Sequence, residues 1–267
     1  MQIWDAQFAA RSPLFEPLRV IADTMQGTAW PAPEAFTALA TAHAVVSGGG
    51  QPLRFADASG RPAPAAADYE LRIHDAGVVP LRAANWHDFF NALVWLAFPQ
   101  TKAALNRVHA AELRAGQGGV RNRRRDVATL FDESGVLVLG SDRAVLERLR
   151  AFEWRRVFWD ERETLLRTTR FFIFGHGLYE KALSPYVGMT GHALVLEVPA
   201  AFEGADLSVL VACADGLAAH ALQVNITQPR DLSPLPVLGV PGWWDANRDA
   251  GFYDNAAYFR PRRARSA

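Results

Sequence analysis

Three polar side chains share one face of a helix that the sequence predicts from Asn85 onward. His87 and Asn91 are one helical turn apart, about 40° around the helix axis, and Asp88 lies beside them. The other positions of this segment are apolar or aromatic, so we expect the helix to be largely buried. Burying a polar group without a partner costs about 1–3 kcal/mol, so each of the three needs a partner or a role. A buried histidine beside carboxylate and amide groups titrates near neutral pH, which suits a general base or a metal ligand.

A second polar row follows on the next predicted helix, which begins at Pro99 because proline suits the first helical turn. Lys102, Asn106 and His109 lie on one face of that helix, at positions i, i+4 and i+7. If the chain folds back at Pro99, the two polar rows meet. His109 is therefore a candidate catalytic residue, while Lys102, Asn106 and Trp95 are candidate substrate-binding residues. The alternative is a solvated face, because polar residues on a helix usually face water.

A third group surrounds a histidine that stands between two glycines, Gly175 and Gly177. His176 and Glu180 share a face if a helix begins there, and Lys181 follows directly. The glycines could bring backbone N–H groups close to an anion at the helix start. Two glycines are weak evidence for such a site, and a simple turn between a strand at Phe171–Phe174 and the helix is the favoured explanation. We count His176 as a candidate catalytic residue and the Glu180–Lys181 pair as candidate substrate-binding residues.

These residues favour an enzyme whose polar pocket is built around His87, and hydrolysis is the reaction class to test first. In this interpretation Asp88 orients or tunes His87, which acts as base or ligand. Asn91 would hold substrate or metal. No recognised ligand pattern identifies a cofactor, so the cofactor is unknown and a divalent metal remains open.

Two alternatives stay open beside the hydrolase, so the sequence does not decide whether the protein is an enzyme. In the first, a non-catalytic binding or scaffold protein, the same side chains form a hydrogen-bond cluster that supports the fold. In the second, Asn91, Trp95, Asn106 and His109 are similar in order to the motif of HNH nucleases, which use a metal at the scissile phosphate. That motif needs a hairpin before its helix and a shorter interval between Trp95 and Asn106.

Composition restricts the partners. The chain has 267 residues, of which 28 are basic and 28 acidic, so net charge provides no support for a nucleic-acid partner. A small molecule or another protein remains as the partner class. Cys213 is the only cysteine, which excludes an intrachain disulfide. The longest strongly apolar run, Phe89 to Phe98, is too short to span a membrane, and no secretory signal is visible, so we expect a soluble, cytoplasmic protein.

The elements that must position these residues indicate an α+β fold, mostly helical with a small mixed or antiparallel sheet. We expect a single domain over 1–267, in which 1–69 form a helical N-terminal lobe with a loop and 70–263 form a core with an aromatic C-terminal tail. Asn85 and Ser141 are expected to cap helices, and in the first of these Asp88 can reach back to the cap. Helices are predicted at 13–25, after Pro33, on both sides of Pro99, after Ser141 and at 207–224. Strands are predicted at 69–74, 171–174 and 192–198, with a hairpin at 127–139 whose turn is 132–135.

Four segments of this chain resemble an uncharacterised bacterial family, DUF3025. The longest is Asn85–Trp95 with Phe98–Pro99, Lys102, Asn106 and His109 after it. The others are Arg125–Asp126 with Phe131–Gly135, Phe174–Lys181, and Pro236–Trp243 with Phe252–Asp254 and Phe259–Pro261. The resemblance covers residues from about 70 to 263. Many relatives have a second acid after Asp254, where this chain has Asn255. The family has no established activity, so the resemblance implies membership and leaves the function open.

Overall fold

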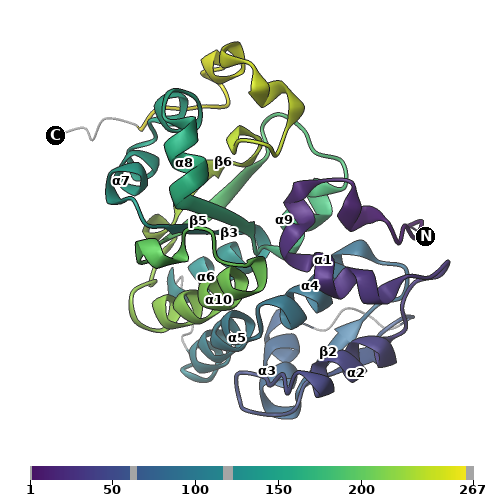
Figure 1. Cartoon of the computed structure of the whole chain (residues 1–267). Coiled ribbons are helices and arrows are strands. Elements are labelled where there is room, and N and C mark those ends of the chain that lie inside the picture. Colours follow the sequence, from purple (N-terminus) through teal and green to yellow (C-terminus); the bar gives the residue numbers. More distant parts are fainter. Residues whose placement is uncertain (1, 61–64, 117–122, 263–267) are drawn as a thin grey trace.

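The computed structural model describes residues 2–60, 65–116 and 123–262 (Figure 1). Within these residues the chain is an α+β protein, mostly helical with two small sheets, as the sequence predicts. The helices are α1 (Arg19–Ala22), α2 (Pro33–Ala42), α3 (Ala66–Ala76), α4 (Trp86–Ala97), α5 (Pro99–Arg114), α6 (Arg123–Ser134), α7 (Arg143–Ala151), α8 (Arg162–Thr168), α9 (His176–Ala182) and α10 (Leu207–Val224). The strands are β1 (Arg54–Asp57), β2 (Val78–Leu81), β3 (Gly135–Gly140), β4 (Thr169–Ile173), β5 (Thr190–Glu197) and β6 (Ser233–Pro236).

Short turns of 3-10 or π helix complete the described chain. They are Phe8–Ala10, Pro13–Leu18, Asp23–Met25, Arg156–Asp160, Ala200–Phe202, Pro229–Asp231, Val237–Gly239, Asp245–Arg248 and Ala250–Asp254. The C-terminal turns have no regular period, as expected from their sequence. They are held by side chains instead: the buried Asn247 amide donates to the carbonyls of Leu238 and Val240, and the Tyr258 hydroxyl donates to the carbonyl of Met189.

The larger sheet has the strand order β4-β3-β5-β6. Its central strand β3 is buried along its whole length, which explains the unbroken apolar run from Val136 to Leu139. β3 pairs in parallel with β5 and antiparallel with β4, while β5 and β6 are antiparallel. Helices α6 and α10 pack on β3 and β5, and both lie below the sheet in Figure 1, with α7 and α8 above it. The smaller sheet is the parallel pair β1-β2.

Helices α4 and α5 form as the sequence predicts. The Asn85 side chain accepts a hydrogen bond from the backbone N–H of Asp88 and so caps α4, and Pro99 is the first residue of α5. The Asp88 carboxylate does not complete a capping box, because it binds Arg82 instead. α4 is buried on nearly every side.

An aromatic layer from the N-terminal segment covers part of α4. Trp4 stacks on Trp86 with ring centroids 5.4 Å apart, and the ring of Phe15 stacks on that of Phe90 at 5.8 Å. Ring pairs of this kind stabilise by about 0.5–1.5 kcal/mol beyond the area they bury. The N-terminal segment therefore fixes the helix that carries His87.

The start of α5 is capped by a different helix. Phe98, the residue at its cap position, has no side chain that can accept a hydrogen bond. Asp215 of α10 takes this role, because its buried carboxylate accepts the backbone N–H groups of Gln100 (3.0 Å) and Thr101 (2.7 Å). The Thr101 hydroxyl donates in return to the Asp215 carbonyl. The contact joins α5 and α10 across 115 residues of sequence.

Among the described helices, α10 alone is long and apolar enough to cross a membrane by length and composition, a span the run Phe89–Phe98 does not reach. In this structure 39% of α10 is buried. It packs on α5 and on the sheet, and the carboxylate of Asp215 faces the α5 terminus.

Three predicted elements are wrong. Residues 69–74 are part of helix α3, not a strand, and only Ile73 of that segment is fully buried, so no helical apolar period is visible in the sequence. The hairpin predicted at 127–139 is instead helix α6 followed directly by strand β3. The cap of α7 is Asp142 rather than Ser141, because the Asp142 carboxylate accepts the first free N–H groups of the helix.

Candidate functional site

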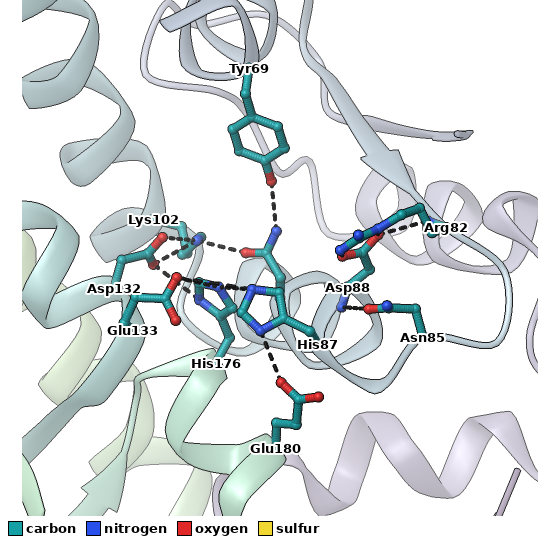
Figure 2. Close-up of polar contacts among 11 residues, drawn as sticks. Tyr69, Arg82, Asn85, His87, Asp88, Lys102, Asp132, Glu133, His176 and Glu180 are labelled. Atoms are coloured by element: carbon teal, nitrogen blue, oxygen red, sulfur yellow. Dashed lines mark hydrogen bonds and ion pairs between the residues drawn. The ribbon is translucent and has the colours of Figure 1, made fainter. Parts of the chain in front are cut away.

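Two histidines and a glutamate from three separate helices converge on one point (Figure 2). His87 comes from the first turn of α4, Glu133 from the last turn of α6 and His176 from the start of α9. The two histidine Nε2 atoms lie 3.1 Å apart. Glu133 Oε1 lies 3.5 Å from Nε2 of His176 and 4.0 Å from Nε2 of His87. In a tetrahedral zinc site the ligand atoms lie about 2.0–2.2 Å from the ion, hence roughly 3.3–3.6 Å from one another. One of the three distances falls in this range, one is slightly shorter and one slightly longer, so the three atoms lie close enough together to bind one ion after small side-chain shifts.

Each histidine has a carboxylate beside its other ring nitrogen. His87 Nδ1 lies 3.1 Å from Oε2 of Glu180, one turn further along α9 than His176. His176 Nδ1 lies 3.7 Å from Oδ1 of Asp132. A carboxylate beside one ring nitrogen favours the tautomer in which that nitrogen carries the proton, which leaves the opposite nitrogen free to bind a metal. His87 thus has the carboxylate partner that metal-binding histidines usually have, and His176 has a carboxylate at the same side of the ring but beyond hydrogen-bond distance.

Asp132 is held by a buried lysine. Nζ of Lys102, which is 4% exposed, lies 2.7 and 3.0 Å from the two Asp132 oxygens and 2.8 Å from Oδ1 of Asn91. The Asn91 amide donates in turn to the hydroxyl of Tyr69 at 2.8 Å. The Lys102 ammonium also lies 5.3 Å from the ring centroid of Trp95, within the range of a cation–π contact.

The charges of this cluster shift the pKa values of its members. Burial alone would raise the pKa of Asp132, but Lys102 and His176 outweigh it and hold that pKa far below its ordinary value. Burial alone would lower the pKa of His176, but the carboxylates of Asp132 and Glu133 outweigh it and raise the pKa to about 9. The hydrogen bond from His176 also lowers the pKa of Glu133. Without a metal, the site therefore holds a positive charge between carboxylates, at the place where a cation would bind.

The two glycines around His176 have a steric reason. A Cβ atom on Gly177 would lie 2.4 Å from Oε2 of Glu133, so glycine leaves the space that the Glu133 carboxylate occupies. A Cβ on Gly175 would lie 2.4 Å from the backbone nitrogen of Ser134, because the start of α9 touches the end of α6. The Gly-His-Gly sequence is thus what allows α9 to approach Glu133.

The structure brings together some of the predicted site residues. His87 and His176 face each other, with Glu180 behind His87 and with Asn91, Lys102 and Trp95 in the layer behind Asp132. The Asp88 carboxylate does not touch His87; its partners are the backbone N–H and guanidinium of Arg82. The carboxylate beside His87 is that of Glu180.

The remaining predicted residues do not contact the histidine pair. Asn106 joins the backbone N–H of Gly48 to the backbone and side chain of Glu70, and Lys181 is exposed on α9. His109 lines a cavity with roughly the room of one water molecule, which Asn106, Trp95, Lys102 and Asp132 also line. In the described residues, His109 Nδ1 and Trp95 Nε1 are buried without a hydrogen-bond partner, as expected of groups that bind a buried water.

Asp132 and Glu133 are the site residues that the sequence did not reveal, although the segment containing them stood out by resemblance.

The strand before α4 bears on the HNH alternative. Strand β2, which precedes α4, pairs in parallel with β1 and forms no hairpin before the helix. The geometry therefore does not favour that motif.

Comparison with known proteins identifies a family but no activity. A family model described as "Protein of unknown function (DUF3025)" matches residues 53–263, which include every residue of the cluster. No curated protein and no solved structure matches the chain.

Proposed function

The chain belongs to the DUF3025 family of proteins of unknown function, and on that premise we propose that it is a metal-dependent hydrolase. His87, Glu133 and His176 would hold one divalent ion, which we take to be Zn²⁺. Imidazole nitrogens and a carboxylate oxygen are ligands that Zn²⁺ binds well, and a two-histidine, one-glutamate set occurs in zinc hydrolases. The observation that carries the proposal is the spacing of the three ligand atoms, with a carboxylate behind each histidine.

The arrangement supports hydrolysis because His87, Glu133 and His176 would hold the ion with three protein ligands, the number that catalytic zinc sites have. An ion held by these three side chains would lower the pKa of a coordinated water to about 7 and would so supply a nucleophile for hydrolysis at neutral pH. The side chains of His87, Glu133 and Glu180 are 33%, 47% and 37% exposed, whereas that of His176 is 6% exposed. Water and substrate would therefore reach the ion from the His87 side, while His176 anchors it from the interior.

The scaffold alternative predicts a different behaviour. In a purely structural cluster, the contact between the two histidine nitrogens would be a hydrogen bond with one shared proton. A divalent ion would then bind with no measurable affinity. The same two histidines with one carboxylate also suit non-haem iron. Metal binding, metal identity and activity together distinguish these three possibilities.

The test begins with metal binding. Metal-free protein, prepared with a chelator, is titrated with Zn²⁺ by calorimetry, as are the His87→Ala and His176→Ala variants. We expect one site per chain in the wild type and a loss of affinity of at least 100-fold in either variant. His220→Ala, at an exposed position of α10, is the matched control and should bind as the wild type does. Equal affinity in the wild type and both site variants would overturn the proposal.

Activity is measured next with the zinc-loaded protein. A panel of chromogenic carboxylic esters, phosphate esters and peptide anilides covers the main hydrolytic classes. We expect turnover of one class that a chelator abolishes and added Zn²⁺ restores, and that His87→Ala lacks. Tight binding of Fe²⁺ with weak binding of Zn²⁺, or no zinc-dependent turnover on any class, would contradict the hydrolase.

A further inference from the structure

The buried position of Lys102 has no simple explanation in stability. Its ammonium is enclosed by three oxygen atoms at 2.7–3.0 Å, two from Asp132 and one from Asn91. Removing an ion pair from water is costly, and a well-packed apolar pair of similar volume is often as stable or more stable. Lys102 is also one of only two lysines in the chain. The contacts of the pair indicate what it does instead.

Asp132 connects the lysine to the proposed metal site. Within the described residues, Nδ1 of His176 is buried without a hydrogen-bond partner, and Oδ1 of Asp132 lies 3.7 Å from it. The Asp132 side chain cannot turn away from His176 without leaving Lys102. Lys102 in turn cannot move without losing Asn91, whose amide is fixed by the hydroxyl of Tyr69. These contacts connect the Tyr69 hydroxyl, through Asn91, Lys102 and Asp132, to the ring of His176.

We propose that Lys102 is a positioning residue for the metal ligand His176. By holding Asp132, it keeps a carboxylate beside Nδ1, so that this nitrogen carries the ring proton and Nε2 presents its lone pair to the ion. Lys102 itself touches neither ion nor substrate. The inference rests on the proposed function, since it concerns the same metal site. In this proposal a residue of α5 orients a metal ligand that belongs to α9.

Lys102→Met is the first variant, because methionine keeps an unbranched apolar stem and removes the ammonium. Loss of an outer-shell partner typically lowers metal affinity 10–100-fold, and we expect an increase of the zinc Kd in that range. Lys181→Met is the matched control, because Lys181 is exposed on α9 and should leave the Kd unchanged. Nitrogen-15 NMR of the zinc-loaded protein gives a second measurement. It should show His176 as a single Nδ1–H tautomer in the wild type and as a mixture in Lys102→Met.

Lys102→Met leaves the Asp132 charge unpaired and can fail to fold, so a double variant accompanies it. Lys102→Met/Asp132→Asn removes both charges, and by the general behaviour of buried pairs it should fold with near wild-type stability. It should still bind zinc 10–100-fold more weakly, which separates positioning from folding. If the wild type binds zinc and the double variant folds and binds it equally tightly, the positioning role is wrong. If the wild type itself binds no zinc, the metal site is wrong, and the two failures are thereby distinguished.

Discussion

Replacing Asp215 by alanine removes the acceptor that α10 provides to the first turn of α5. Two backbone N–H groups lose their hydrogen bonds, and that of Thr101 belongs to a buried residue, whereas Gln100 is exposed. No side chain of α5 itself can replace the cap, because Phe98 stands at the cap position. The Thr101 hydroxyl keeps its bond to the carbonyl of residue 215.

The magnitude follows from these contacts. A hydrogen bond to a charged acceptor contributes about 1.5–3 kcal/mol, and loss of a helix cap costs about 0.5–2 kcal/mol. Burial raises the pKa of Asp215 in spite of its hydrogen bonds, which shows that the lost hydration of the carboxylate offsets part of their value. We therefore expect the free energy of unfolding to fall by about 2–4 kcal/mol in Asp215→Ala, taking two bonds with partial offset.

Urea unfolding, followed by circular dichroism and by tryptophan fluorescence, measures this change. The midpoint should fall while the slope m stays the same, since the area exposed on unfolding hardly changes. Asp206→Ala is the matched control, because Asp206 precedes the same helix, is exposed and makes no side-chain cap hydrogen bond. We expect the control to stay within about 0.5 kcal/mol of the wild type. A loss in Asp215→Ala no larger than in Asp206→Ala would refute the capping argument.

Three further predictions concern the site. In the metal-free protein, the pKa of His176 is raised from 6.5 to about 9, so the contribution of this group to stability is complete below pH 6.5 and is lost as the pH rises through 9. The melting temperature should therefore fall less steeply between pH 6 and 10 in His176→Gln than in the wild type. Asp88→Ala should lower the free energy of unfolding by about 1 kcal/mol, because the hydrogen bonds between Asp88 and Arg82 are lost, and should leave the zinc Kd unchanged. An increased zinc Kd in calorimetry would instead indicate a role for Asp88 beside His87. Gly177→Ala should raise the zinc Kd several-fold with a change in stability below about 1 kcal/mol, because the added methyl group displaces the flexible end of Glu133; a Kd equal to that of the wild type contradicts this.

Local signals in the sequence predicted the helices that carry the site. The Asn85 cap, the first-turn Pro99 and the apolar positions between them depend on neighbours within one or two turns, and the structure confirms both helices. The bounds of α10 are predicted to the residue for the same reason. The candidate catalytic list contained both histidines of the cluster, since each stood out by its own surroundings.

The meeting of those histidines could not be predicted. His87 and His176 are 89 residues apart, and their contact depends on how α4 packs against α9, which no periodicity records. The sequence predicts a turn at Asp132 and Glu133 because Asp-Glu-Ser-Gly is typical of one. The spacing of Val127, Ala128 and Phe131 was the helical signal that competed with it, and α6 in fact runs to Ser134 and passes into β3 without a loop.

The assembly of three ligands from α4, α6 and α9 determines the order in which this protein would fold and take up its ion. A long stretch of chain must close before the ligand atoms meet, so the site forms only after the helices have docked. In a zinc finger, by contrast, the ion is what drives folding. Here the proposed ligands stand on helices that pack against one another, and the buried Lys102–Asp132 pair lies beside them. A chelator should therefore remove the proposed ion and leave the fold intact. Which ion binds in the cell would then depend on the concentrations of free metal ions that the folded chain meets.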